Sequence, residues 1–141
     1  MKIGITAATG QLGKLVVESL KQKVASENIV VLVRTPEKAS DLGVEAKAFD
    51  YSNKATQVEA LKGIDTLLLI SGSEVGQREV QHANVIASAK EAGVKKIVYT
   101  SLLHADTSTL SLAVEHIATE KNLSYASEDN TQRSWHCFVN R

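Results

Sequence analysis

The sequence predicts an α/β fold in which helices cover both faces of a parallel sheet of five strands, in the order 3-2-1-4-5. Strand-like and helix-like segments alternate along residues 1–123, as they do when right-handed helical crossovers join parallel strands. Hydrophobic residues make up 43% of the 141 residues but aromatic residues only 4%. The core is therefore mostly aliphatic, which suits a sheet that is buried on both faces.

The first unit joins a short strand that begins at Ile3 to a helix over about 11–23. Leu12, Val16 and Leu20 recur at helical spacing, which predicts that this stripe of the helix is buried. The turn between strand and helix is built from small residues. It is therefore the place where backbone N–H groups face the carboxyl edge of the sheet.

The following units repeat this plan. Residues 28–33 form a continuous run rich in β-branched residues, which predicts a strand buried on both faces. Pro36 favours the first turn of a short helix, and Gly63 and Gly93 favour helix ends. The other predicted elements are strands over 44–49, 65–70 and 95–100 and helices over 54–62, 77–92 and 109–123. Together these units predict a Rossmann-type doubly wound domain over residues 1–123.

Residues 124–141 form a divergent tail. They read S-Y-A-S-E-D-N-T-Q-R-S-W-H-C-F-V-N-R and show neither helical nor strand periodicity. No further strand–helix unit is expected there, which leaves the predicted strand 95–100 as an open edge. Either the tail or a second copy of the chain, in a homodimer, would have to cover it.

Composition argues against several classes of partner. Lys plus Arg and Asp plus Glu number 16 each, so no net charge attracts nucleic acid or an anionic membrane. The sequence shows no apolar run of membrane-spanning length and no signal-peptide pattern. The lone Cys137 forms no internal disulfide, and the four histidines show no metal-ligand spacing. We therefore expect a cytoplasmic protein without a metal site.

The turn after the first strand has the pattern A-x-x-G-x-x-G. Gly10 would let the backbone approach a pyrophosphate, and Gly13 would let the helix lie close to the strand. Ala7 replaces the first glycine of the usual fingerprint. If that position requires a positive φ, alanine costs on the order of 1 kcal/mol. The alternative is a turn that only packs the helix on the strand.

Arg34 lies about twenty residues beyond the glycines, at the end of the second predicted strand. An arginine there suits the extra phosphate of NADP, whereas an acidic residue suits NAD. The alternative interpretation is that Arg34 is a solvated loop residue near Glu37. Lys38 either assists Arg34 in binding the extra phosphate or is itself solvated. Asp50 and Tyr51 end the third strand, where an adenine would lie, although such an aspartate also caps turns.

The ends of the fourth and fifth strands face the same crevice. Ser71, Gly72 and Ser73 are small enough for a cofactor to pass the backbone, although a plain flexible loop is the alternative. Ser101 and His104 follow the fifth strand, at the nicotinamide end, and are candidates for catalysis. A serine at a strand end more often satisfies a backbone group.

The last predicted helix carries closely spaced polar residues. Glu115 and Thr119 are four residues apart, as are His116 and Glu120, and Lys121 follows. Such a set could line the crevice, but a solvated helix face is the commoner interpretation.

Several longer strings carry a family resemblance: T-A-A-T-G-Q-L-G, V-R-T-P-E-K-A, L-L-L-I-S-G-S-E-V-G-Q-R, Y-T-S-L-L-H-A-D-T-S and E-H-I-A-T-E-K-N-L. Over residues 1–123 the chain closely resembles the NmrA-like branch of atypical short-chain dehydrogenase/reductases, nearest to its bacterial NADPH-dependent quinone oxidoreductases. The resemblance implies a Rossmann fold that binds NADPH and passes a hydride to a quinone, its small-molecule substrate.

Pattern and resemblance together predict one cofactor site. Its members are Thr6, Ala7, Thr9, Gly10, Gln11, Leu12, Gly13, Arg34, Lys38, Asp50, Tyr51, Ser71, Gly72, Ser73 and Thr100. The branch generally lacks the Tyr-x-x-x-Lys pair of ordinary short-chain dehydrogenases, and this chain lacks it too. Ser101, His104 and Lys121 are then weak catalytic candidates, since the cofactor itself carries the hydride chemistry.

Family members continue for roughly as many residues again, into a small substrate lobe. This sequence diverges after Leu123, so we expect that lobe to be missing. Three functions follow: a quinone reductase, a redox-sensing regulator that binds dinucleotide without turnover, and an inactive truncated fragment. We take the first as the inherited function and expect little turnover from this chain.

Overall fold

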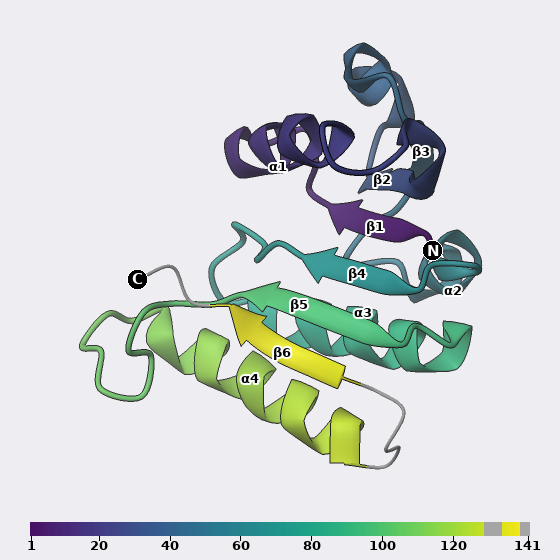
Figure 1. Ribbon diagram of the computed structural model, residues 1–141. Coiled ribbons are helices and arrows are strands. Elements are labelled where there is room, and N and C mark those ends of the chain that lie inside the picture. The colour runs from purple at the N-terminus through teal and green to yellow at the C-terminus, as the bar shows by residue number, and fades with distance from the viewer. Residues whose placement is uncertain (129–133, 139–141) are drawn as a thin grey trace.

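The fold is built on one parallel sheet with strand order β3-β2-β1-β4-β5-β6 (Figure 1). The computed structural model describes residues 1–128 and 134–138. The strands are β1 (Ile3–Thr6), β2 (Ile29–Val33), β3 (Glu45–Ala48), β4 (Thr66–Leu69), β5 (Lys96–Thr100) and β6 (Ser134–Phe138). Every neighbouring pair runs parallel. The first five strands have the predicted order, and β6 is an addition to it.

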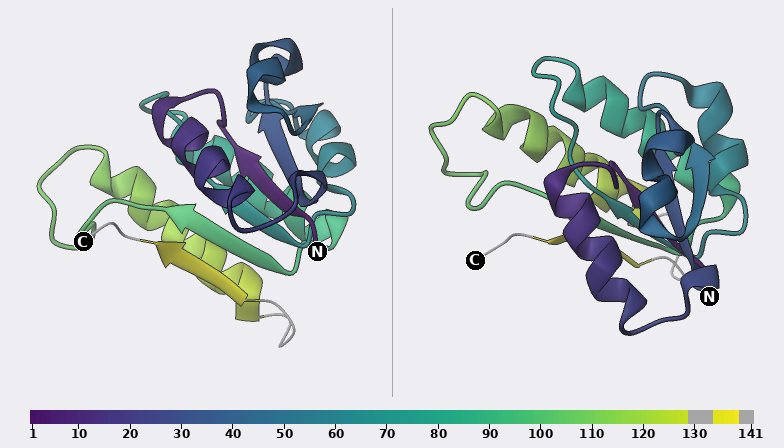
Figure 2. Two further views of the ribbon diagram at one scale, coloured as in Figure 1. Left: turned by 45° about the horizontal axis from the view of Figure 1, so that its top comes forward. Right: turned by 90° about the horizontal axis from the view of Figure 1, so that it is seen from above.

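Helices cover both faces of the sheet (Figures 1 and 2). They are α1 (Gln11–Lys21), α2 (Lys54–Leu61), α3 (Arg78–Ala92) and α4 (Ala113–Glu128), with 3₁₀ turns at Ser26–Asn28 and Pro36–Leu42. Helix α1 and the second turn pack on one face, and the other three helices pack on the opposite face. Pro36 begins its turn as predicted, and Gly93 ends α3 with a φ of 83°.

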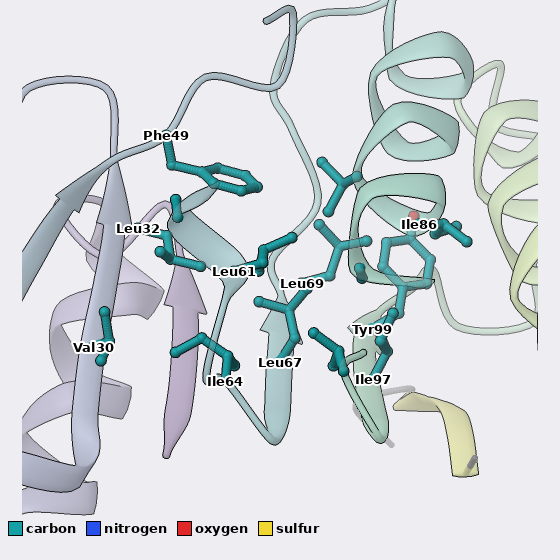
Figure 3. Close-up of a cluster of buried hydrophobic side chains, with 14 of the residues drawn as sticks. Val30, Leu32, Phe49, Leu61, Ile64, Leu67, Leu69, Ile86, Ile97 and Tyr99 are labelled. Atoms are coloured by element: carbon teal, nitrogen blue, oxygen red, sulfur yellow. The ribbon is translucent and has the colours of Figure 1, made fainter. Parts of the chain in front are cut away.

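Strand β2 divides the core between the two faces, because successive side chains of a strand point in opposite directions. Ile29, Val31 and Val33 join the cluster under α1. Val30 and Leu32 join the cluster on the other face, which Figure 3 shows with Leu67, Leu69, Ile97 and Tyr99. The β-branched run that predicted a strand buried on both faces is thereby confirmed.

The buried stripe of α1 differs from the predicted one. Gly13 and Val17 are its buried residues, while Leu12 is 48% exposed. Val16 and Leu20 are only partly buried. The reason is the close approach of α1 to the turn after β1, which turns Gly13 inward and leaves Leu12 partly exposed beyond the carboxyl ends of the strands.

The end of the chain departs most from expectation. Helix α4 begins at Ala113 rather than at 109, after a turn in which the Leu110 N–H donates to the Ser108 hydroxyl (3.2 Å). It also continues past Leu123 to Glu128. Residues 129–133 and 139–141, which the sequence assigned to the divergent tail, lie outside the described residues.

Strand β6 corrects the prediction that the tail adds no strand. It pairs with β5 in parallel register, from Lys96 opposite Ser134 to Thr100 opposite Phe138, so the edge of β5 is not open (Figure 1). Five residues are too few to show a clear period. Their strand conformation is decided by pairing with β5 rather than by local pattern.

Candidate functional site

A cleft of about 460 Å³ lies beyond the carboxyl ends of the strands, between the start of α1 and the loops after β2, β3 and β4. This is the point at which strand order reverses between β1 and β4, where open α/β sheets bind ligands. Most of the predicted cofactor residues line it: Ala7, Thr9, Gly10, Gln11, Leu12, Gly13, Arg34, Lys38, Asp50, Tyr51, Ser71, Gly72 and Ser73.

The amino end of α1 opens into this cleft. Gln11, Leu12 and Gly13 form its first turn and line the cleft. Among the described residues no side chain caps this helix, and its first turn carries no acidic residue. The first N–H groups of a helix have no partner within it, and the helix dipole makes this end positive. The arrangement is therefore suited to an anion.

Close packing requires a glycine at position 13 of this turn. A Cβ on Gly13 would lie 2.5 Å from both the Ala7 carbonyl oxygen and the Ala8 Cα, so only glycine fits there. This confirms the predicted packing role of Gly13. Ala7 has a φ of 51°, the left-handed conformation that strains alanine by about 1–2 kcal/mol.

At the other end of the cleft, Arg34 follows β2 and is 75% exposed. Its Nη1 lies 3.9 Å from the Oε1 of Glu74, a residue in the loop after β4. The other Glu74 oxygen accepts a hydrogen bond from Gln81 Nε2 (2.9 Å). Such an exposed pair contributes little stability, so the guanidinium is available to a stronger anion.

Asp50 and Tyr51 have structural partners as well as a place in the cleft. The Ser52 N–H donates to Asp50 Oδ1 (2.8 Å), which confirms the turn-capping interpretation of Asp50. The Tyr51 hydroxyl lies 2.7 Å from Thr6 Oγ1 and 2.5 Å from the Ile70 carbonyl oxygen. Burial raises the pKa of Tyr51 well above its usual range, so the hydroxyl stays protonated.

Two predicted cofactor residues do not line the cleft. The buried Thr6 hydroxyl donates to the Leu68 carbonyl (3.2 Å) and accepts from the Ile70 N–H (2.9 Å). The Thr100 hydroxyl accepts from the Ser71 N–H (2.9 Å). Both threonines tie neighbouring strand ends together, and so shape the cleft from behind.

None of the three catalytic candidates lines the cleft. The Ser101 hydroxyl donates to Glu120 on α4. His104 is exposed, with a φ of 51°, and Lys121 is exposed on α4. The structure therefore does not bring these residues together with the predicted cofactor site.

The polar residues of α4 are not a solvated face. The Glu115 side chain is only 13% exposed and pairs with Arg78, whose Nη1 lies 2.9 Å from Glu115 Oε2. His116 and Thr119 are buried. The interpretation favoured from sequence is thus wrong for these three residues, because α4 packs this side against α3 and the loop after β4.

Sequence reasoning also missed part of the lining. The additional residues are Leu32, Val33, Thr35, Phe49, Ile70, Glu74 and Gln81. Most of them end a strand or follow one, so their position at the carboxyl edge was a usable signal. Gln81 lies on α3 and Glu74 in a loop, and no local pattern connects either to Arg34.

Comparison with known proteins decides the family. The model of a protein family described as NAD(P)H-binding matches residues 7–134. The chain belongs to this NAD(P)H-binding family. Quinone oxidoreductase 2 of Escherichia coli is 58% identical over 125 residues, which cover 86% of this chain and 44% of the relative. An NmrA-like family domain-containing oxidoreductase of Aspergillus flavus is 34% identical over 133 residues, with 87% and 43% covered.

Solved structures agree with these relatives. The E. coli NADPH-dependent quinone oxidoreductase complexed with NADPH superposes with a TM-score of 0.91 at 52% identity, over 98% of this chain and 48% of that one. The Citrobacter triphenylmethane reductase complexed with NADP(H) gives 0.92 at 39% identity, over 99% and 49%. The resemblance expected from the sequence is confirmed, and the NAD(P)H-binding chain spans about half the length of these proteins.

Two features are absent from the part of the chain that the structure describes. No helix there has the length and hydrophobicity to cross a membrane. No three or more His, Cys, Asp or Glu side chains gather there as metal ligands would.

Proposed function

We propose that this chain forms the cofactor-binding part of an NADPH-dependent oxidoreductase that reduces a quinone. One observation carries the proposal: a single cleft joins the uncapped start of α1 to the cations Arg34 and Lys38. The E. coli relative is a quinone oxidoreductase, and its structure was solved with NADPH. This similarity supports both the cofactor and the acceptor.

The residues of the cleft fit a dinucleotide with an extra phosphate. The first-turn N–H groups of α1 would bind the diphosphate, and the Arg34 fork would bind the 2′-phosphate. Lys38 lies in the same lining and would add charge. The small residues Ser71, Gly72 and Ser73 would let the rest of the molecule pass the backbone.

The chain's own contribution is to bind and align. When bound, the reduced dinucleotide supplies a hydride; the quinone takes up this hydride and a proton to become a hydroquinone. Ser101, His104 and Lys121 lie outside the cleft lining. Water, rather than any of these side chains, therefore donates the proton to the quinone.

A titration and a turnover assay test the proposal together. NADPH fluorescence measures binding, and loss of NADPH absorbance with menadione measures reduction. Binding with consumption supports the reductase. Binding without consumption contradicts turnover by this chain and favours a dinucleotide-sensing regulator. Absence of binding contradicts the proposal and favours an inactive fragment.

Arg34→Ala tests the assignment of the 2′-phosphate. Loss of a charge-assisted contact weakens binding by about tenfold to a hundredfold, so we expect that loss for NADPH and a change within about twofold for NADH. Lys23→Ala, which removes an exposed charge beyond the far end of α1, is the control. Equal losses for both cofactors would refute the role of Arg34.

Glu74→Gln tests the same end of the cleft in the opposite direction. The Glu74 carboxylate pairs with Arg34 and would repel a phosphate that binds there. Removing this exposed charge should tighten NADPH binding by about threefold, with little change for NADH. Weaker NADPH binding would mean that Glu74 holds Arg34 in place rather than competing for it.

A further inference from the structure

The peptide backbone of Gly72 is held from both sides by buried side chains of α3. The Gly72 N–H donates to His82 Nε2 (2.9 Å), and the Gly72 carbonyl accepts from Arg78 Nε (2.5 Å). His82 is fully buried and Arg78 is 9% exposed. A glycine has no side chain to restrict its backbone, so these two contacts fix the orientation of a segment that lines the cleft.

Both of these side chains are themselves anchored on α4. His82 Nδ1 lies 3.0 Å from Thr119 Oγ1, and Arg78 pairs with Glu115. The other Glu115 oxygen accepts from the Gly76 N–H (2.7 Å). Helix α4 thus reaches the loop after β4 through contacts between residues 37 positions apart.

The contacts of His82 with Thr119 and with Gly72 require the same ring nitrogen to carry the proton. The Thr119 hydroxyl donates its hydrogen to the Glu115 carbonyl (3.0 Å), so toward His82 it accepts. His82 Nδ1 must then carry the hydrogen. That leaves Nε2 as the lone-pair nitrogen, which is the form that accepts the Gly72 N–H. Only one tautomer satisfies all of these contacts.

We propose that Thr119 is a positioning residue of the cofactor site: by holding His82 in its Nδ1–H form, it fixes the Gly72 backbone against the bound dinucleotide. The inference rests on the proposed function for the identity of the ligand. Helix α4, which contributes no residue to the lining of the cleft, thereby influences cofactor affinity through His82 and Gly72.

Two substitutions of Thr119 test it. Thr119→Val keeps the shape but removes the acceptor, which frees His82 to adopt the other tautomer and break the contact with Gly72. We expect NADPH affinity to fall by about tenfold, the loss of one hydrogen bond to a fixed backbone group. Thr119→Ser keeps the hydroxyl and should bind within about twofold of the unmodified protein.

The control is Tyr99→Phe. It deletes another buried hydroxyl, which lies 2.5 Å from His116 Nδ1 at the contact between β5 and α4, and it keeps the aromatic ring that packs against the His82 ring. Thermal unfolding of Thr119→Val and Tyr99→Phe shows whether these two variants lose comparable stability. We expect Tyr99→Phe to retain NADPH affinity; an equal loss in both variants would mean a general packing effect and would overturn the proposal.

Nitrogen-15 NMR gives a readout that does not depend on NADPH. The ring nitrogens of His82, assigned by comparison with His82→Gln, should show the Nδ1–H form in the unmodified protein. Thr119→Val should convert part of it to the Nε2–H form and move the Gly72 amide signal. An Nε2–H form in the unmodified protein overturns the inference, even if Thr119→Val does not fold.

The two readouts separate the inference from the proposed function. If the unmodified protein binds no NADPH, the proposed function fails, while the tautomer and the Gly72 amide still decide whether Thr119 acts on this loop. If NADPH binds and Thr119→Val moves the Gly72 amide without changing affinity, the positioning role is refuted and the proposed function stands.

Discussion

The two faces of the sheet are packed by different chemistry. Under α1 the buried cluster is entirely aliphatic: Ile5, Ala8, Val17, Ile29, Val31, Val33, Ala39, Leu42 and Ile70. The helices on the other face carry nearly all the buried polar residues: Gln57, Arg78, Gln81, His82, Ser88, His116 and Thr119. Aliphatic contacts depend on volume and are tolerant of exchange. Buried polar groups require specific partners, so the second face also determines where the loops around the cleft lie.

Most of these polar contacts reach a loop at the carboxyl edge, while His116 contacts the hydroxyl of Tyr99 on β5. Gln57 Nε2 donates to the backbone carbonyls of Asp50 (2.7 Å) and Tyr51 (3.1 Å), while its Oε1 accepts from Ser88 (2.9 Å). Arg78 and His82 hold Gly72 in the same way. The buried polar residues of this face therefore fix the cleft loops by hydrogen bonds, whereas the α1 face contributes the start of α1 and the aliphatic residues Val33 and Ile70 to the lining.

The largest expected effect comes from breaking the buried ion pair on the polar face. Glu115→Gln leaves the charge of Arg78 without its partner at a site where both side chains are nearly buried. Removing one member of such a pair costs about 3 kcal/mol of unfolding free energy, which urea unfolding measures. Glu18→Gln, in an exposed pair with Lys21, is the control and should cost less than about 0.5 kcal/mol. Equal losses in both would remove the distinction between the two faces.

The polar face should also make stability depend on pH. Burial above all, together with the nearby His116 and Arg78 and against an opposing effect of Glu115, lowers the pKa of His82 from 6.5 to about 4. Between these two values the unfolded chain binds a proton that the folded chain does not. Stability therefore falls as pH falls, by about 2 kcal/mol between pH 7 and pH 5.

Urea unfolding across this range measures the effect, with His82→Gln as the comparison. Since burial also lowers the pKa of His116, some dependence of the same sign remains in that variant. Carboxyl groups with lowered pKa, such as Glu45, lose their contribution only below about pH 4.5. A pH dependence that His82→Gln leaves unchanged would show that His82 is not the group responsible.

The smallest effect is expected on the aliphatic face. Ile29 is fully buried under α1, and Ile29→Val removes one methylene group at a cost of about 1 kcal/mol. Because Ile29 begins β2, at the end of the strand away from the cleft, and does not line the cleft, NADPH affinity should stay within about twofold. A tenfold loss of affinity measured by titration would show that aliphatic packing positions the site as well.

Local patterns were sufficient for the plan of the fold. Alternation of strand and helix predicted the order of the first five strands, and Pro36 and Gly93 marked element ends that the structure confirms. The glycine pattern located the start of α1, which lines the cleft. These features depend on residues close together in the chain, where spacing and backbone preference are visible in the sequence.

The sequence by itself determined a doubly wound parallel sheet with an anion-binding turn and an arginine at its carboxyl edge. Only the tertiary structure decided that β6 pairs with β5, that Glu74 meets Arg34, and that Thr119 reaches Gly72 through His82. The physical reason is range: hydrophobic periodicity acts over one or two turns of a helix. The partner of a buried polar group, in contrast, is chosen by packing between elements far apart in the chain.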